Sequence, residues 1–255
     1  MIKFFRRIRQ NLLNEGKTTR YFKYAIGEII LVVIGILIAL QINNWNELRK
    51  ADVEEQRALH NIYRDFIKNK DILVEVKTNS LLIINSGIQI LNHTGAKSKP
   101  ESENILNELL NKLYNSSPYY PQNGFLDDLL SSGKLGIFKN VELRNLLSSW
   151  KPEVEILEEM FHSLDTSEDI LNTYILEHGS WLNADQVTEE ARNVKFPKSG
   201  FKVDNRDLLN ALLFENLVEN LVIAADNYYS TQQKTEKLLD KIIELLESEI
   251  EKNND

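Results

Sequence analysis

An uninterrupted apolar stretch near the N-terminus, Ala25–Ile42, constrains the fold of this chain of 255 residues more than any other feature. It reads AIGEIILVVIGILIALQI, and only Glu28 and Gln41 in it carry polar side chains. As an α-helix, a stretch of this length rises about 27 Å, at roughly 1.5 Å per residue, close to the hydrocarbon thickness of a bilayer. We therefore predict a single transmembrane helix over residues 25–45.

The flanks of this stretch favour one orientation. Residues 1–24 contain seven basic residues against the single acid Glu15, and such a bias keeps a flank in the cytoplasm. Aromatic rings on both sides suit the headgroup region. The predicted membrane-interface anchors are Arg6, Arg7, Arg9, Arg20, Lys23, Tyr21, Tyr24 and Trp45. The N-terminus is thus expected in the cytoplasm, and residues 46–255 on the other side of the membrane.

A cleavable signal peptide is the main alternative for this region. Its apolar part would be about 7 to 15 residues long and would precede a small-x-small cleavage site. Here the apolar run is longer, and Ala39-Leu40-Gln41 offers no small residue before a cut, which favours an uncleaved anchor. The basic residues 1–24 suit either an amphipathic helix in the inner-leaflet interface or a simple cluster of topogenic charges.

Polar and small residues inside the span are candidate functional positions. Glu28 lies about one turn inside the boundary, so its carboxyl is expected to be protonated, to reach the interface beside Lys23, or to face a partner helix. Gly35 and Ala39 form a small-x-x-x-small pair, and Gly27 continues it two turns earlier. This face allows close helix approach, and self-association through it is one hypothesis.

Beyond the span, the pattern predicts an all-α domain. Residues 46–92 place apolar or tolerated residues at alternating spacings of four and three: Leu48, Asp52, Glu55, Leu59, Ile62, Phe66, Asn69, Leu73, Val76, Ser80, Ile83, Gly87 and Ile90. Too many of these are polar for a free-standing coiled coil, so the helix should pack in a bundle. It is expected to continue from the span and to pack antiparallel to a last helix over residues 205–252.

Shorter elements are predicted between these long helices. Helices are expected over 101–114, 125–132 and 141–178. Gly133 should end the second of them, and Asn140 should cap the third. Pro152 should kink or split the third helix, because proline lacks a backbone donor. Residues 179–204 show no sustained period and are predicted to be the longest loop.

Two sequence segments resemble a known family. The first is GEIILVVIGILIALQINNWN, residues 27–46, behind FFRRIRQNLLNEGK, and the second is FLDDLLSSGKLGIFKNVELRNLL, residues 125–147. Together they resemble a family of bacterial single-pass membrane proteins known only as a domain of unknown function. The resemblance implies an inner-membrane location, with residues 46–255 in the periplasm, and it carries over no catalytic residue.

Composition and motifs exclude several classes of function. Outside residues 1–24 the chain has 23 basic and 37 acidic residues, which makes it a poor ligand for nucleic acid. The chain has no cysteine, hence no disulfide or thiolate chemistry. Glu159 and His162 have the spacing of a di-iron ligand pair, but the second pair that such sites need is missing. Asp127-Asp128 and Glu158-Glu159 are ordinary for solvated helix faces, so no metal, cofactor or catalytic residue is predicted.

The remaining candidate is the aromatic pair Tyr119-Tyr120, with Trp150 and Trp181 elsewhere in the sequence. These rings suit either core packing or a ligand pocket between helices, and core packing is the stronger interpretation. The sequence as a whole favours a non-enzymatic, membrane-tethered interaction or scaffold module whose partners are the bilayer and other proteins or itself. An extracytoplasmic ligand sensor is the alternative hypothesis, and a membrane-anchored enzyme is the least favoured.

Overall fold

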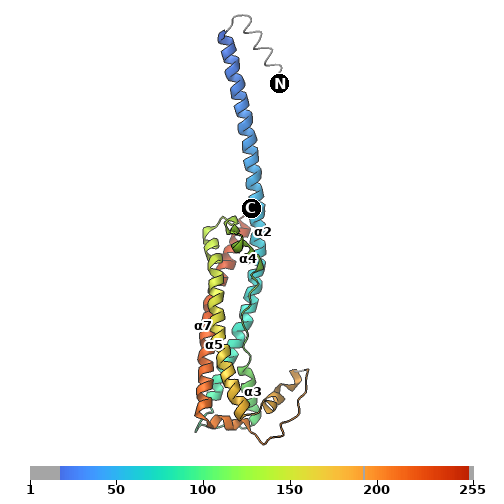
Figure 1. The fold of residues 1–255 in the computed structure, drawn as a ribbon, viewed down its shortest axis with the longest axis vertical. Helices are drawn as coiled ribbons and strands as arrows, with labels where there is room; N and C mark the ends of the chain where they lie inside the picture. The colour runs from blue at the N-terminus through green and yellow to red at the C-terminus, as the bar shows by residue number, and fades with distance from the viewer. Residues whose placement is uncertain (1–17, 192, 253–255) are drawn as a thin grey trace. The chain divides into compact units, whose positions relative to one another are not determined.

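The computed structural model describes residues 18–191 and 193–252, and all the regular structure in these residues is helical, as predicted. The chain divides into two compact units, residues 1–57 and 58–255, and each is described by itself. The helical elements in chain order are α2 (Thr18–Leu91), α3 (Glu103–Leu113), α4 (Gly124–Ser131), η1 (Lys134–Ile137), α5 (Val141–His178), α6 (Trp181–Asp185), η2 (Gln186–Ala191), η3 (Asn205–Asn210) and α7 (Leu212–Glu251) (Figure 1).

The described part of the first unit is the N-terminal portion of α2, which carries the apolar stretch. Its most apolar window has a mean hydropathy of 2.6, and none of that window is buried. Ile34 and Leu37, for example, are 50% and 59% exposed. The helix is long and apolar enough to cross a membrane, a test that a signal sequence near the N-terminus also passes.

In the second unit, the later part of α2 packs antiparallel to α7, which confirms the predicted pairing of the long helices. Lys70 Nζ lies 2.6 Å from Asp240 Oδ1, and Lys77 Nζ lies 2.5 Å from Glu236 Oε2. One end of the pair is marked by Tyr63, whose hydroxyl donates to Glu247 Oε1 at 2.8 Å. As the residue number rises along α2, the number of the contacting residue in α7 falls, so the two helices run in opposite directions.

The predicted stripe on α2 faces the bundle from Leu59 onward, whereas its first two positions, Leu48 and Asp52, are exposed because they precede the part of α2 that packs in the bundle. From Leu59 to Ile90 every position of the stripe is buried, including the polar Asn69 and Ser80. Gly87 belongs to it because α7 approaches there so closely that a Cβ would collide with the side chain of Val222. A larger residue at position 87 would therefore force the two helices apart.

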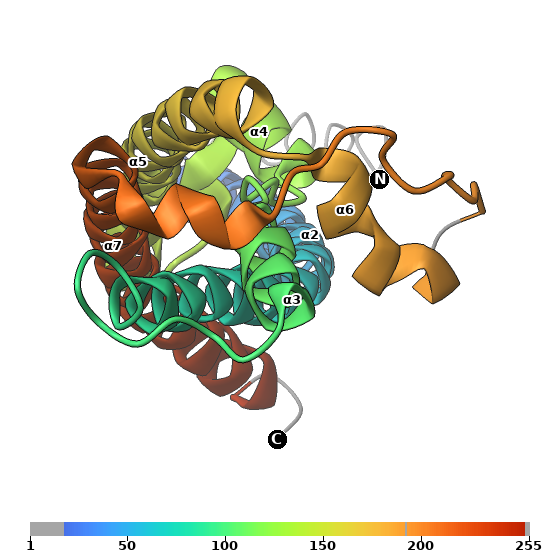
Figure 2. The ribbon, with the colours of Figure 1, turned by 90° about the horizontal axis from the view of Figure 1, so that it is seen from below.

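The third long helix, α5, also packs against α7, and Figure 2 shows the two side by side, with α3 and α6 at the near end. Lys241 Nζ pairs with Glu142 Oε1 at 2.6 Å, and Thr235 Oγ1 donates to Glu153 Oε1 at 3.3 Å, so this pair is antiparallel too. Pro152 lies inside α5 without dividing it, contrary to the split that we considered. The fully buried Trp150 and the buried Leu157 hold the helix on both sides of the proline, and this burial outweighs one lost backbone bond.

The predicted end of α4 at Gly133 and the predicted cap of α5 at Asn140 are both confirmed. Gly133 has a φ of +68°, the left-handed conformation expected where α4 ends. The Asn140 side chain accepts a hydrogen bond from the Leu143 backbone N–H at 3.0 Å and so caps α5.

The start of the last helix differs from the prediction. Residues 205–210 form the separate 3-10 turn η3, and Ala211, in an extended conformation, precedes the first residue of α7, Leu212. The reason is that Asn205 is fully buried and its side chain forms hydrogen bonds with Ser180 and Asn107. Its Oδ1 accepts from Ser180 N–H at 2.7 Å, and its Nδ2 donates to Asn107 Oδ1 at 2.7 Å.

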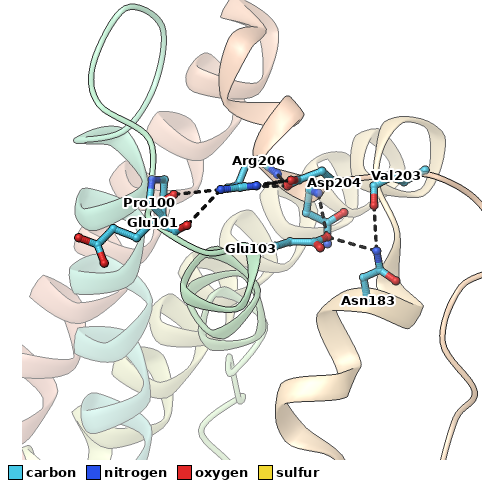
Figure 3. Close-up of polar contacts among 8 residues, drawn as sticks. Pro100, Glu101, Glu103, Asn183, Val203, Asp204 and Arg206 are labelled. Carbon is cyan, nitrogen blue, oxygen red and sulfur yellow. Dashed lines mark hydrogen bonds and ion pairs between the residues drawn. The ribbon is translucent and has the colours of Figure 1, made fainter.

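Residues 179–204, predicted as a loop, begin with the short helices α6 and η2 and are fastened to the bundle by polar contacts (Figure 3). Glu103 Oε1 accepts from Asn205 N–H at 2.9 Å and from Asn183 Nδ2 at 3.2 Å. Arg206 Nη2 lies 2.5 Å from Asp204 Oδ2, and the guanidinium holds the pKa of that carboxyl below its usual range. The described residues at the two ends of this connection are thus fastened to the bundle.

Candidate binding pocket at residues 115–123

The segment that links α3 to α4, residues 115–123, is non-helical but is fixed in place by side chains from the long helices. On α2, the side-chain amide of the buried Asn69 pairs with both backbone groups of Gln122. Its Oδ1 accepts from Gln122 N–H at 2.6 Å, and its Nδ2 donates to Gln122 C=O at 3.2 Å. Its own backbone carbonyl accepts from the Tyr119 hydroxyl at 3.2 Å. Three bonds to one residue therefore hold the middle of the segment.

The same segment is bonded to the other two long helices. Trp150 Nε1 on α5 donates to Asn123 Oδ1 at 2.9 Å, and the Tyr228 hydroxyl on α7 donates to Ser117 C=O at 3.3 Å. Burial raises the pKa of Tyr228 to about 12, so its hydroxyl stays a donor at neutral pH. Side chains from α2, α5 and α7 therefore all hold this segment.

The two neighbouring tyrosines of this segment have different environments. Tyr119 is 6% exposed and lies edge-on to Trp150, with ring centroids 6.4 Å apart, so it belongs to the core. Tyr120 is 72% exposed. The core interpretation is therefore correct for Tyr119 and Trp150, while Tyr120 is available to a ligand.

A cavity of about 170 Å³ lies between this segment and α5. Its lining includes the prolines and aromatic rings of Pro118, Tyr119, Tyr120, Pro121 and Phe161. The rest is lined by Asn123, Val154, Glu158 and His162. Phe161 is held by Tyr228 behind it, at a centroid distance of 5.6 Å. The cavity is large enough for a small organic group, since a cavity of about 150 Å³ accepts a benzene ring.

The charge at this pocket is negative. Glu158 is a lining residue, and its Oε1 lies 3.9 Å from His162 Nε2. Among the described residues, the lining includes no lysine or arginine. Outside the lining, Lys68 lies near the segment, with its Nζ 3.5 Å from Gln122 Oε1. The site thus combines aromatic and proline surface with one carboxylate.

A second polar cluster lies at the beginning of the segment. Glu168 on α5 is 8% exposed; its Oε2 accepts from Ser116 Oγ at 2.7 Å, and its Oε1 has no hydrogen-bond partner among the described residues. Burial raises the pKa of this carboxyl to about 7. The buried Tyr114 hydroxyl has no partner there either, and burial and the Glu168 charge raise its pKa above the usual range. This cluster is less well satisfied than the contacts around Asn69.

The described residues contain no group of three or more His, Cys, Asp or Glu side chains that could hold a metal ion. The Glu159–His162 spacing considered for iron does not produce one, since His162 lies beside Glu158. Asp127 and Asp128 lie on the exposed face of α4.

The predicted membrane-related residues occupy the N-terminal unit. Lys23, Tyr24, Gly27 and Glu28 line one depression on α2 together with Leu31, so Lys23 and Glu28 share a face. A Cβ added at Gly27 or Gly35 would meet nothing within 4 Å, and Ala39 is exposed. Trp45 is 65% exposed, with the Arg49 guanidinium 6.0 Å from its ring centroid. Their roles at a membrane stay predictions.

The remaining predicted anchors are only partly visible. Arg20 and Tyr21 lie at the start of α2, within the helix but without a described side chain. Arg6, Arg7 and Arg9 lie outside the described residues.

Tyr119 and Tyr120 were considered for a pocket from the sequence, but the residues that hold the 115–123 segment in place were missed. Asn69 stood on the apolar stripe as a tolerated polar residue, and a polar side chain on a buried face was the available signal that it has a specific partner. Glu158 was interpreted as a solvated helix acid, and Glu168 was not considered. No local sequence pattern separates these two residues from other helix acids, because the residues that lie beside them, 116–121, are far away in the sequence.

Comparison with known proteins gives one match. Residues 28–149 match a family of unknown function, DUF6090, which confirms the resemblance to a domain of unknown function. No curated protein and no solved structure matches the chain. The matched region runs from Glu28 through α3 and α4 into the first part of α5, so it includes the 115–123 segment.

Proposed function

We propose that this protein is a non-enzymatic, single-pass inner-membrane protein whose helical bundle binds protein partners or a second copy of itself. The observation that carries this proposal is the apolar stretch of α2, of whose most apolar window none is buried. The transfer of this apolar surface from water into lipid lowers the free energy strongly. The basic residues 1–24 support a cytoplasmic N-terminus and a periplasmic bundle.

A surface of the bundle supports the binding role. Val74, Leu81 and Ile88 follow one another at seven-residue spacing along α2 and are 49%, 39% and 47% exposed. Residues at this spacing share a helix face. Exposed apolar side chains that share one helix face can form a contact with another protein.

Site-specific crosslinking in intact membranes tests the binding role. A photo-reactive residue at position 81 is expected to give adducts of higher mass. The same residue in place of Glu219, an exposed acid of α7, serves as the matched control and should give none. Monomer alone at both positions would contradict the proposal.

Topology is tested separately. A reporter fused after Asp255 should be active only outside the cytoplasm, and an N-terminal epitope tag should remain on the mature protein. Loss of the tag would identify a cleaved signal sequence, and cytoplasmic reporter activity would reverse the orientation.

A ligand sensor is the second candidate, and the pocket beside Tyr120 is the observation that favours it. In that case ligand would change the crosslinking pattern at position 81. An unchanged pattern when a bound ligand saturates the pocket would speak against a sensor.

A further inference from the structure

The pocket beside Tyr120 has the composition of a site for a positively charged organic group. A cation is attracted to the face of an aromatic ring by the ring's quadrupole, and more strongly once water is excluded. Tyr120 and Phe161 supply such rings, and the carboxylate of Glu158 lines the same cavity. Neither the rings nor the carboxylate alone would specify a ligand; together they favour a cation with an apolar surface.

The other charge classes fit this pocket poorly. An anion would meet the Glu158 carboxylate, and the described lining residues include no lysine or arginine to balance it. A bare metal ion would find one carboxylate and one imidazole, fewer ligands than the three protein ligands of an open zinc site. A neutral apolar ligand would gain nothing from the carboxylate.

Size and rigidity narrow the choice. The cavity of about 170 Å³ is small, so it suits a group of the size of a trimethylammonium head. The backbone that presents Tyr120 is fixed by the Asn69 bonds to Gln122 and by the Trp150 bond to Asn123. A preformed wall costs little ordering entropy on binding.

We propose that the cavity formed by Tyr120, Phe161 and Glu158 binds a small organic cation of the alkylammonium class. The acidic excess of the chain outside residues 1–24 raises the local concentration of cations near the domain. The inference rests on the pocket alone and does not depend on membrane anchoring or on a protein partner.

The test is ligand-observed NMR on the full chain in maltoside micelles, with choline as the probe. Its neutral isostere 3,3-dimethyl-1-butanol has the same shape without the charge. Choline is expected to bind saturably in the millimolar range, at least fivefold more tightly than the isostere. Equal affinity for the two molecules, or no saturable choline binding, would overturn the proposal.

Three substitutions at exposed positions test whether the binding takes place in this cavity. Glu158→Gln keeps the shape and should weaken choline binding about fivefold, whereas Glu159→Gln, the next residue of the same helix and not part of the lining, should leave it within about twofold. Tyr120→Ala should weaken it to a similar extent as Glu158→Gln. If Glu158→Gln and Glu159→Gln behave alike, the choline is bound elsewhere and the assignment is wrong.

Discussion

Two buried polar clusters of the bundle, one around Asn205 and one around Glu168, differ in how completely their groups are paired. The Asn205 side chain uses its amide in both directions, to Ser180 and to Asn107. At Glu168, one carboxylate oxygen and the nearby Tyr114 hydroxyl have no partner among the described residues. The satisfied cluster stabilises the fold, whereas the unsatisfied one costs stability once its carboxyl is charged.

The largest expected effect is at the satisfied cluster. Asn205→Ala would leave Ser180 N–H and Asn107 Oδ1 unpaired inside the protein. The free energy of unfolding should fall by about 3 kcal/mol, as expected for two buried groups that lose their partners. Urea denaturation followed by circular dichroism measures the change. Asn216→Ala, at an exposed position of α7, is the control and should change it by less than about 0.5 kcal/mol.

The next effect is at Glu168, and its sign depends on pH. The pKa of this carboxyl rises from 4.5 to about 7 on folding, so the folded state binds more protons between these values. The stability that it contributes is present in acid and is lost as the pH rises through 7. At pH 8, Glu168→Gln should therefore increase the free energy of unfolding by about 2 kcal/mol, and at pH 4 it should change little.

The control for this prediction is Glu159→Gln, an exposed substitution on the same helix. It should show no difference between the two pH values in urea denaturation. A Glu168→Gln variant that is equally stable to wild type at both pH values would mean that the carboxyl is charged in the fold without penalty, and the contrast between the clusters would disappear.

The smallest effects come from two tyrosine hydroxyls. Tyr119→Phe removes the donor to the Asn69 carbonyl and should cost about 1 kcal/mol. Tyr114→Phe removes a buried hydroxyl without a partner and should be neutral or stabilising by up to about 1 kcal/mol. Opposite signs in thermal unfolding would support the contrast, and equal losses would show that Tyr114 has a partner in solution, such as a buried water.

The sequence predicts the long helices and their buried faces well, because periodicity records which face is apolar. The α2 stripe is buried from Leu59 to Ile90, and Asn140 and Gly133 mark helix ends through purely local chemistry. Where tertiary contacts decide, the sequence is less informative. Pro152 stays inside α5 because its neighbours are buried, and Ala211 breaks the last helix because Asn205 is needed in another contact.

The candidate site was harder to predict, for the same reason. Tyr119 and Tyr120 are adjacent and chemically identical, yet one is core and the other is surface. The difference comes from Asn69, which lies fifty residues earlier and fixes the direction of the segment. Glu158 becomes part of a pocket only because residues 118–121 pass beside it. Contacts between residues so far apart produce no periodic pattern in the sequence.

The close approach at Gly87 limits how this bundle can move. A sliding motion of α2 along α7 would lift Val222 out of the notch above Gly87 and would break the Lys77–Glu236 ion pair at the same time. Piston-like shifts, by which many helical receptors pass a signal along their axis, are therefore costly in residues 58–91. A signal that passes through this part of α2 is therefore expected to involve local repacking of side chains that leaves the contact between Gly87 and Val222 in place.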